Sequence, residues 1–285
     1  MTALFIGVVS HGNSRFAVSQ GPGGLARQLE THLSSAGVDV HVQVNTADAY
    51  DPGPQPVTDE MVQASLTEQL HLDRRWAVYL GGGRGPKWWA MHGARWMKRG
   101  QQTLRSPGPR MVERLLNIEL SHFDLLRRGV LTGSDWTLVL EDDAWSADVA
   151  DCAAGVLALM TDRDAAGSPS YVNVSHSFSN EELRITHLLS TVADTRWGGG
   201  VDRKLLSASR PVTNTVCAIL YRTAFAEQLL ATMEALPLEP VVPIDWKLNI
   251  ALMQMYDSGA LGDGSCWLVE PAPIDQLSMR PEPKP

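Results

Sequence analysis

The chain has 285 residues and a formal net charge of −8, which argues against a general nucleic-acid binder because such proteins normally present a basic face. Its three cysteines are widely spaced and form no CxxC pair, so we expect neither a zinc site nor a disulfide framework and favour a reducing, cytoplasmic location. The apolar runs are too short for a signal peptide or a membrane span, so we expect no transmembrane segment; peripheral membrane association is left open.

The first part of the chain alternates strand and helix patterns. Apolar runs and valine–polar alternation predict strands, and leucines at helical spacing predict helices. The predicted strands are 3–12, 38–45 and 76–83, and the predicted helices are 23–37 and 59–71. This alternation predicts an α/β fold of Rossmann type, with a mostly parallel central sheet flanked by helices.

The same pattern continues to the end of the chain. Residues 110–129 carry apolar side chains at helical spacing, and the apolar run 136–141 predicts a buried strand. The elements expected after these are a helix near 147–162, a strand over 170–177, a strand running into a helix within 213–233, a helix over 243–256 and a strand over 266–271. With no repeat and no clear linker, one compact domain is expected over 1–275, followed by a disordered tail over 276–285.

In the stretch WTLVLEDDAW, residues 136–145, an apolar predicted strand is followed directly by three acidic residues. In a strand, Glu141 and Asp143 would share one side and Asp142 would point to the other. Two carboxylates at the carboxyl end of a strand suit Mg²⁺ or Mn²⁺, and this edge of an open α/β sheet is where ligands bind. The alternative is a strand end whose acids are simply solvated, and the residues alone leave both open.

Other segments surround this motif in a recognisable order. LNIELSHFDLLRRG (116–129) carries a Ser-His dipeptide, TNTVCAILYRTAFAEQLL (213–230) has a tyrosine before a helix, and PIDW (243–246) is similar to a Pro-Val-Asp element. Over roughly 111–250 the chain therefore resembles the lipopolysaccharide-type glycosyltransferases of family 25. It departs from that family in having Ile118-Glu119 where Gly-Cys is usual, and in segments 84–109 and 178–210, which match no part of it.

The resemblance implies a GT-A fold, a nucleotide-sugar donor that carries UDP, and a metal ion at the acidic motif. Residues 1–145 would form the nucleotide-binding half and residues 146–275 the acceptor-binding half. The positions carried over are Glu141 and Asp143 for the metal with Asp142 between them, Ser121 and His122 for the Ser-His pair beside the donor, and Asp245 for the acid of the Pro-Val-Asp element. A packed histidine is the plain alternative for His122.

Asp245 is the candidate general base, because an inverting transfer needs a carboxylate to take the proton from the acceptor hydroxyl. The alternative is an acid that only stabilises the start of a helix. Candidates for contacts with the nucleotide end the first two predicted strands and are Ser10, His11, Gly12, Arg15 and Asn45. Among them, Gly12 allows close backbone approach and Arg15 can pair with phosphate, whereas an ordinary turn is the alternative for Asn45.

Two glycine-rich stretches are candidates for mobile loops. GGGRGPK (81–87) lacks the GxxxxGK[ST] arrangement, so it is not a phosphate-binding P-loop, but it fits a loop that closes over a sugar nucleotide. WGGG (197–200) is a candidate second lid beside the acceptor.

We therefore expect a metal-dependent hexosyltransferase that moves a sugar from a UDP-sugar to an acceptor hydroxyl with inversion, using Mn²⁺ or Mg²⁺. The resemblance points to an acceptor in a glycan or a lipopolysaccharide-like molecule. Two alternatives stay open: a non-catalytic protein that binds sugar nucleotides or glycans on the same scaffold, and a nucleotidyltransferase that uses a nucleoside triphosphate.

Overall fold

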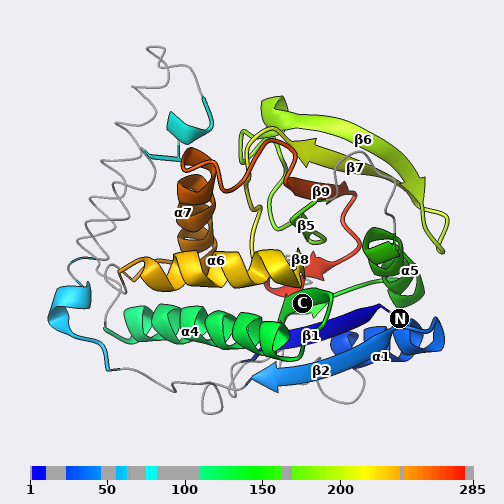
Figure 1. Cartoon of the computed structure of the whole chain (residues 1–285), viewed down its shortest axis with the longest axis horizontal. Helices are drawn as coiled ribbons and strands as arrows, with labels where there is room; N and C mark the ends of the chain where they lie inside the picture. The colour runs from blue at the N-terminus through cyan, green and yellow to red at the C-terminus, as the bar shows by residue number, and fades with distance from the viewer. Residues whose placement is uncertain are drawn as a thin grey trace, which may run out of the picture.

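The computed structural model describes residues 2–10, 24–45, 56–62, 64, 75–76, 78–81, 109–161, 169–237 and 241–279. These residues form a mixed α/β fold around an eight-stranded sheet of order β2–β1–β3–β8–β5–β9–β7–β6 (Figure 1). The strands are β1 Ala3–Val9, β2 Asp39–Asn45, β3 Trp136–Glu141, β5 Tyr171–Asn173, β6 Leu189–Arg196, β7 Asp202–Ala208, β8 Ala218–Arg222 and β9 Cys266–Glu270. A separate pair joins β4 Ala144–Trp145 to β10 Asp275–Gln276.

The sheet is mostly parallel in strand direction. β1 runs parallel to both β2 and β3, and β5 runs parallel to β9. β8 lies antiparallel between β3 and β5, and β7 lies antiparallel between β9 and β6. Six of the eight strands therefore point one way, and β8 and β7 point the other.

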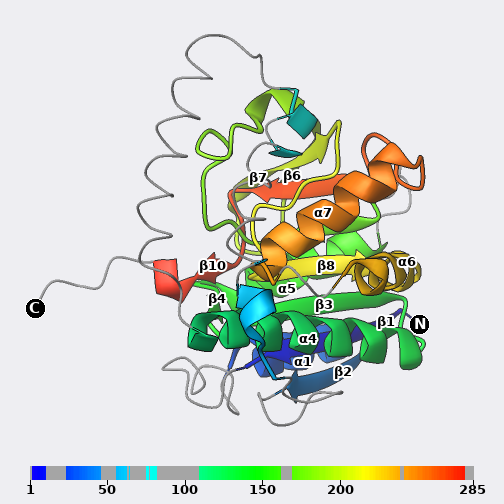
Figure 2. The same ribbon diagram turned by 90° about the vertical axis from the view of Figure 1, so that its left-hand side faces the viewer.

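Helices cover both faces of this sheet (Figure 2). One layer contains α4 Pro109–Leu131, α6 Thr223–Ala235 and α7 Ile244–Asp257, and the other contains α1 Leu25–Ser35 and α5 Val149–Thr161. The side chains of β1 alternate between two cores, because Phe5 and Val9 belong to the cluster that includes α4, α6 and α7, whereas Leu4, Ile6 and Val8 belong to the cluster with α1 and α5. A strand buried on both faces is apolar throughout, as the sequence of β1 is.

Most predicted elements are confirmed, including β1, β2 and β3, the helices α1, α4, α5 and α7, and the strand–helix unit β8–α6. The described residues 59–62 and 64 of the predicted helix 59–71 are helical. The predicted strand at 170–177 is shorter, and β9 ends one residue earlier than expected. None of the described helices combines the length and the apolar character needed to cross a bilayer.

The strand predicted at 76–83 is wrong for its described residues. Residues 75–76 and 78–79 are helical, and the Leu80 amide donates a hydrogen bond to the Trp76 carbonyl at 2.9 Å. The aromatic rings explain the difference, because Trp76 and Tyr79 pack against Trp246 and Tyr256 of α7. A short apolar run has no period that separates strand from helix, so this tertiary packing decides.

One hairpin was not foreseen, and one further prediction needs correction. The hairpin is β6–β7, and the candidate lid at 197–200 lies in its turn, where Trp197 is buried against Gly155 of α5. The disordered tail was placed too early, because Gln276 pairs with Ala144 and Leu277–Met279 form a 3₁₀ turn. The glycine- and tryptophan-rich segment 82–108 lies outside the described residues.

Helix α4 touches the sheet closely at Gly129. A Cβ added there would lie 2.4 Å from Oγ1 of Thr137, a side chain of β3 that is fully buried. Alanine normally stabilises a helix by about 1 kcal/mol relative to glycine, but overpacking a buried contact costs about 1–3 kcal/mol. We therefore expect Gly129→Ala to lower the free energy of unfolding in urea titrations. Gly262→Ala is the control because its Cβ would meet no atom within 4 Å, and equal effects of the two changes would contradict the packing argument.

Candidate functional site

The carboxyl ends of three neighbouring parallel strands meet at one edge of the sheet. Val9, the last residue of β1, is in register with both Asn45 of β2 and Glu141 of β3. Because β8 is reversed, its start also lies at this edge, and the Glu141 amide donates to the Cys217 carbonyl at 2.9 Å. Ser10, Asn45 and the acidic motif therefore lie at a common edge, where open α/β sheets bind ligands.

The acidic motif forms a turn rather than a continued strand. β3 ends at Glu141, Asp142 and Asp143 form the turn, and β4 follows. Alternation along a strand therefore cannot explain their arrangement. Even so, one ligand atom each from Glu141, Asp143 and Cys217 lie within 4.8 Å of one another.

Asp143 is the most enclosed of these carboxylates, with 5% of its surface exposed. Its Oδ2 accepts a long hydrogen bond of 3.4 Å from the Ser278 amide, and its Oδ1 has no hydrogen-bond partner in the described part of the chain. A buried oxygen without a donor costs about 1–3 kcal/mol, and a bound cation would remove that cost. Because oxygen ligands suit hard divalent ions, the two carboxylates of this group fit Mn²⁺ or Mg²⁺.

Glu141 is surrounded mainly by negative charge. Burial raises the pKa of its carboxyl to about 8, helped by Asp143, Asp245 and Asp142, while Arg114 opposes the shift. Asp245 from α7 and Arg114 from α4 therefore act on the same carboxylate. Gln276 donates a hydrogen bond from Nε2 to Glu141 Oε2 at 3.1 Å and supplies a neutral donor.

This raised pKa predicts a pH dependence of stability. The unfolded chain loses the proton of Glu141 near pH 4.5, whereas the folded protein keeps it until about pH 8. Between these two pH values the folded state therefore binds more protons, and the free energy of unfolding falls as pH rises. Without added metal, Glu141→Gln should remove part of the fall in unfolding free energy between pH 6.5 and 8, a fall to which the Glu141 proton contributes about 1.5 kcal/mol at most. Urea titrations at these two pH values measure it, and the exposed Glu227→Gln is the control.

Asp245 is the second residue of α7, directly after Pro243 and Ile244. Burial raises the pKa of its carboxyl, and the backbone amides of Trp246 and Asp245 itself oppose that shift. These hydrogen bonds show that the Asp245 carboxylate also stabilises the start of α7. The raised pKa nevertheless brings this carboxylate closer to the range in which a general base works well.

Ser121 and His122 are buried in α4, with 3% and 4% of their surfaces exposed. Gly129 lies against Thr137 near the start of β3, and Leu125 lies against Gly7 of β1. Since a helical turn advances about as far as two strand residues, Ser121 is expected at the level of Glu141.

An acid two residues before Ser121 also connects α4 to α7, the helix that carries Asp245. Glu119 of α4 forms an ion pair with Lys247 of α7, with 3.2 Å between Oε1 and Nζ. Both side chains are almost fully buried, and burial raises the pKa of Glu119 to about 7 despite Lys247. A buried ion pair thus joins α4 to α7.

The predicted nucleotide contacts are only partly described. The Ser10 amide donates to the Asn45 carbonyl at 2.8 Å, and the Asn45 side chain donates to Asp124 Oδ2 at 2.6 Å. Arg128 pairs with the same Asp124 oxygen at 2.7 Å, so the Asn45 amide belongs to an internal network. His11, Gly12 and Arg15 lie outside the described residues.

Three residues at this site were missed from the sequence: Arg114, Cys217 and Gln276. Gln276 reaches Glu141 across 135 positions of sequence, so no local pattern could reveal it. Cys217 lies within the segment 213–233 that was predicted as a strand running into a helix, but its place beside Glu141 depends on β8 being reversed. Arg114 was expected to lie on a helix, with no signal that it affects the acids.

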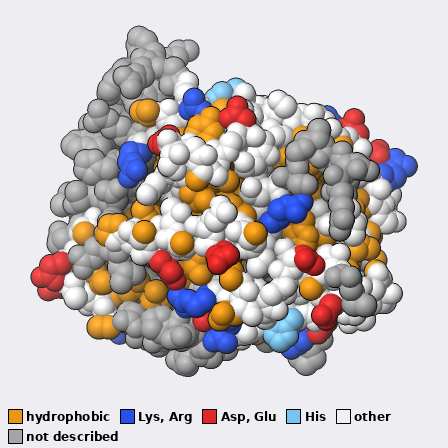
Figure 3. All heavy atoms as spheres, in the orientation of Figure 1, with side chains coloured by type: hydrophobic (Ala, Val, Ile, Leu, Met, Phe, Trp, Pro, Cys, Tyr) orange, Lys and Arg blue, Asp and Glu red, His pale blue; other side chains and the backbone are white. Residues whose placement is uncertain are grey.

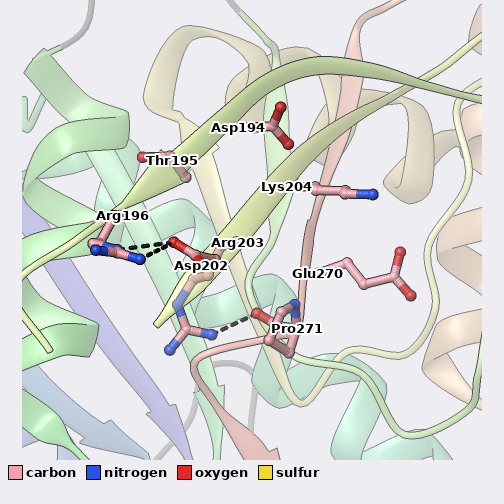
Figure 4. A pocket seen from close by; sticks show the side chains of 8 residues that line it. All are labelled: Asp194, Thr195, Arg196, Asp202, Arg203, Lys204, Glu270 and Pro271. Carbon is pink, nitrogen blue, oxygen red and sulfur yellow. Dashed lines mark hydrogen bonds and ion pairs between the residues drawn. The ribbon is translucent and has the colours of Figure 1, made fainter. Parts of the chain in front are cut away.

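A hollow of about 750 Å³ lies over β6, β7 and the end of β9 (Figure 4). Its lining mixes both signs of charge, and Arg196 and Asp202 form an ion pair at its rim. Lys204 of β7 lies opposite Glu270 of β9 in the sheet. β3, whose end carries the acidic motif, is four strand spacings from β7, or roughly 19 Å. None of the predicted site residues lines this hollow.

The described surface carries no single-signed patch on the face drawn in Figure 3, where acidic and basic side chains are interspersed. A scan against protein-family models and a search of curated protein sequences each found no match to this chain.

Proposed function

We propose that this protein is a metal-dependent glycosyltransferase of GT-A type, which transfers a hexose from a nucleotide sugar carrying UDP to an acceptor hydroxyl. The mixed α/β sheet with helices on both faces is compatible with that fold. The observation that carries the proposal is the convergence of Glu141 and Asp143 at the end of β3, with Asp245 close enough to influence the same carboxylate.

Each carboxylate has a separate role in this proposal. Glu141 and Asp143 hold Mn²⁺ or Mg²⁺, which when bound neutralises the charge that builds up on the departing diphosphate. Asp245 takes the proton from the acceptor hydroxyl as the hydroxyl oxygen attacks the anomeric carbon, which gives inversion. The raised pKa of Asp245 supports this role, since a more basic carboxylate accepts a proton more readily.

The first test is calorimetric titration of UDP into the protein with and without Mn²⁺. We expect binding to require the metal and Asp143→Asn to weaken it by about 10–100-fold, because the variant removes a charged ligand but keeps the shape of the side chain. Glu227→Gln, a change of an exposed acid on α6, should bind as the wild type does. UDP binding that ignores both Mn²⁺ and Asp143→Asn would contradict the proposal.

Turnover separates an enzyme from a binding protein. With a UDP-hexose and a panel of hydroxyl acceptors, the proposal predicts release of UDP that depends on metal and acceptor. Metal-dependent binding of UDP without turnover would instead favour a non-catalytic sugar-nucleotide-binding protein on this scaffold.

A further inference from the structure

The third member of the converging group is a cysteine, which is an unusual neighbour for two carboxylates. Cys217 is fully buried, and its sulfur lies within 4.8 Å of a carboxylate oxygen of both Glu141 and Asp143. Small buried cysteines usually pack among apolar side chains, and Cys217 does so in the core cluster that includes α1 and α5. Its sulfur also borders the two acids proposed to hold the metal.

The Cys217 thiol differs from the Cys266 thiol in its backbone hydrogen bond. The Cys266 thiol donates to the Val212 carbonyl at 2.9 Å, whereas the acceptor found for the Cys217 thiol is the Asp275 carbonyl at 3.9 Å. The Ser175 side chain is a further hydrogen-bond partner of the Cys217 sulfur. Beside it, Oδ1 of Asp143 is buried and has no hydrogen-bond partner in the described structure.

We propose that Cys217 is a third protein ligand of the metal site, which makes the site prefer thiophilic divalent ions over Mg²⁺. On binding, the Cys217 S–H bond breaks, the sulfur keeps the electron pair for its bond to the ion, and the proton passes to solvent. Carboxylates suit Mg²⁺ and Mn²⁺ alike, but thiolate ligands favour Zn²⁺, Co²⁺ and Cd²⁺, with Mn²⁺ ahead of Mg²⁺. The inference rests on the proposed function because it assumes that Glu141 and Asp143 are metal ligands.

Cobalt provides a test that does not depend on activity. Co²⁺ titrated into the wild-type protein should produce a thiolate-to-cobalt charge-transfer band in the near ultraviolet, and Cys217→Ser should lose that band. We also expect Cys217→Ser to bind Cd²⁺ about 10–100-fold more weakly while its affinity for Mg²⁺ changes little. Cys152→Ala, a change of a buried cysteine on α5, is the matched control and should keep the band.

The outcomes separate this inference from the proposed function. If Co²⁺ binds the wild type without the band, or binds Cys217→Ser equally well, Cys217 is not a ligand, while the carboxylate site and the proposed function remain. If Co²⁺ does not bind even with UDP present, both fail. Should Cys217→Ser not fold, the double variant Cys152→Ala/Cys266→Ala leaves Cys217 as the sole cysteine, and absence of the band in the folded variant overturns the inference.

Discussion

Asp245→Asn should lower kcat for sugar transfer by about 10²–10⁴-fold and leave metal-dependent binding of UDP within a few-fold of the wild type. The amide keeps the size of the side chain but cannot take a proton from the acceptor hydroxyl. Steady-state kinetics with a UDP-hexose, together with UDP titration in the presence of Mn²⁺, measure the two quantities separately. Asp257→Asn, a change of an exposed acid at the far end of α7, should alter neither.

The pH profile gives this prediction a second readout. A general base works when it has lost its proton, so kcat/KM of the wild type should fall as pH falls through the pKa of Asp245, which burial raises. That acidic limb should disappear from the residual activity of Asp245→Asn. If the variant instead loses UDP binding as Asp143→Asn does, Asp245 belongs to the metal site and is not the base.

Arg203→Met should lower the free energy of unfolding by about 3–5 kcal/mol, because it leaves a buried carboxylate without its partner. Arg203 of β7 pairs with Asp151 of α5 at 2.5 Å, and the two side chains are 7% and 1% exposed. Arg203 also donates to the Pro271 carbonyl, and Asp151 accepts from the Gly199 amide at 2.8 Å. This pair therefore joins the hairpin, the end of β9 and α5.

The same hairpin contains a matched control. Arg196 and Asp202 form an ion pair of 2.7 Å whose side chains are 62% and 81% exposed, so Arg196→Met should cost at most about 1 kcal/mol. Guanidinium titrations of both variants measure the difference. Combining Arg203→Met with Asp151→Leu should recover part of the loss, because no buried charge is then left unpaired. A loss for Arg203→Met no larger than that for Arg196→Met would contradict the argument.

The sequence was most informative where local pattern and packing agree. The apolar run of β3 and the leucine spacing of α1 and α4 led to the correct elements, because the same side chains that set the period also fill the two cores. Trp76 and Tyr79 misled for the opposite reason, since their position is set by rings on α7 that a window of eight residues does not contain. The β6–β7 hairpin was missed because its outer strand is polar and only partly buried.

At the candidate site, too, local motifs identified some residues, whereas others depend on distant parts of the chain. Glu141, Asp143 and Asp245 were identified from short motifs, which the structure brings to one edge of the sheet. The reason given for the convergence of Glu141 and Asp143 was incorrect, since a turn and not strand alternation achieves it. Cys217 could not be foreseen, because its position depends on the reversed direction of β8, which no residue near Cys217 encodes.

The reversed position of β8 has a consequence for how the protein is made on the ribosome. β3 lies between β1 and β8 in the sheet, so its second side stays open until residues 218–222 have been synthesised. The hydrogen bond from Gln276 to Glu141 can form only after a further stretch of synthesis, because Gln276 is 135 positions later in the chain. Such distant closures slow folding, because the entropy of the intervening chain is lost before the contacts form. A nascent chain that ends before residue 217 therefore carries the acidic motif but lacks its finished surroundings, and the candidate cation site is completed only after residue 276 has been made.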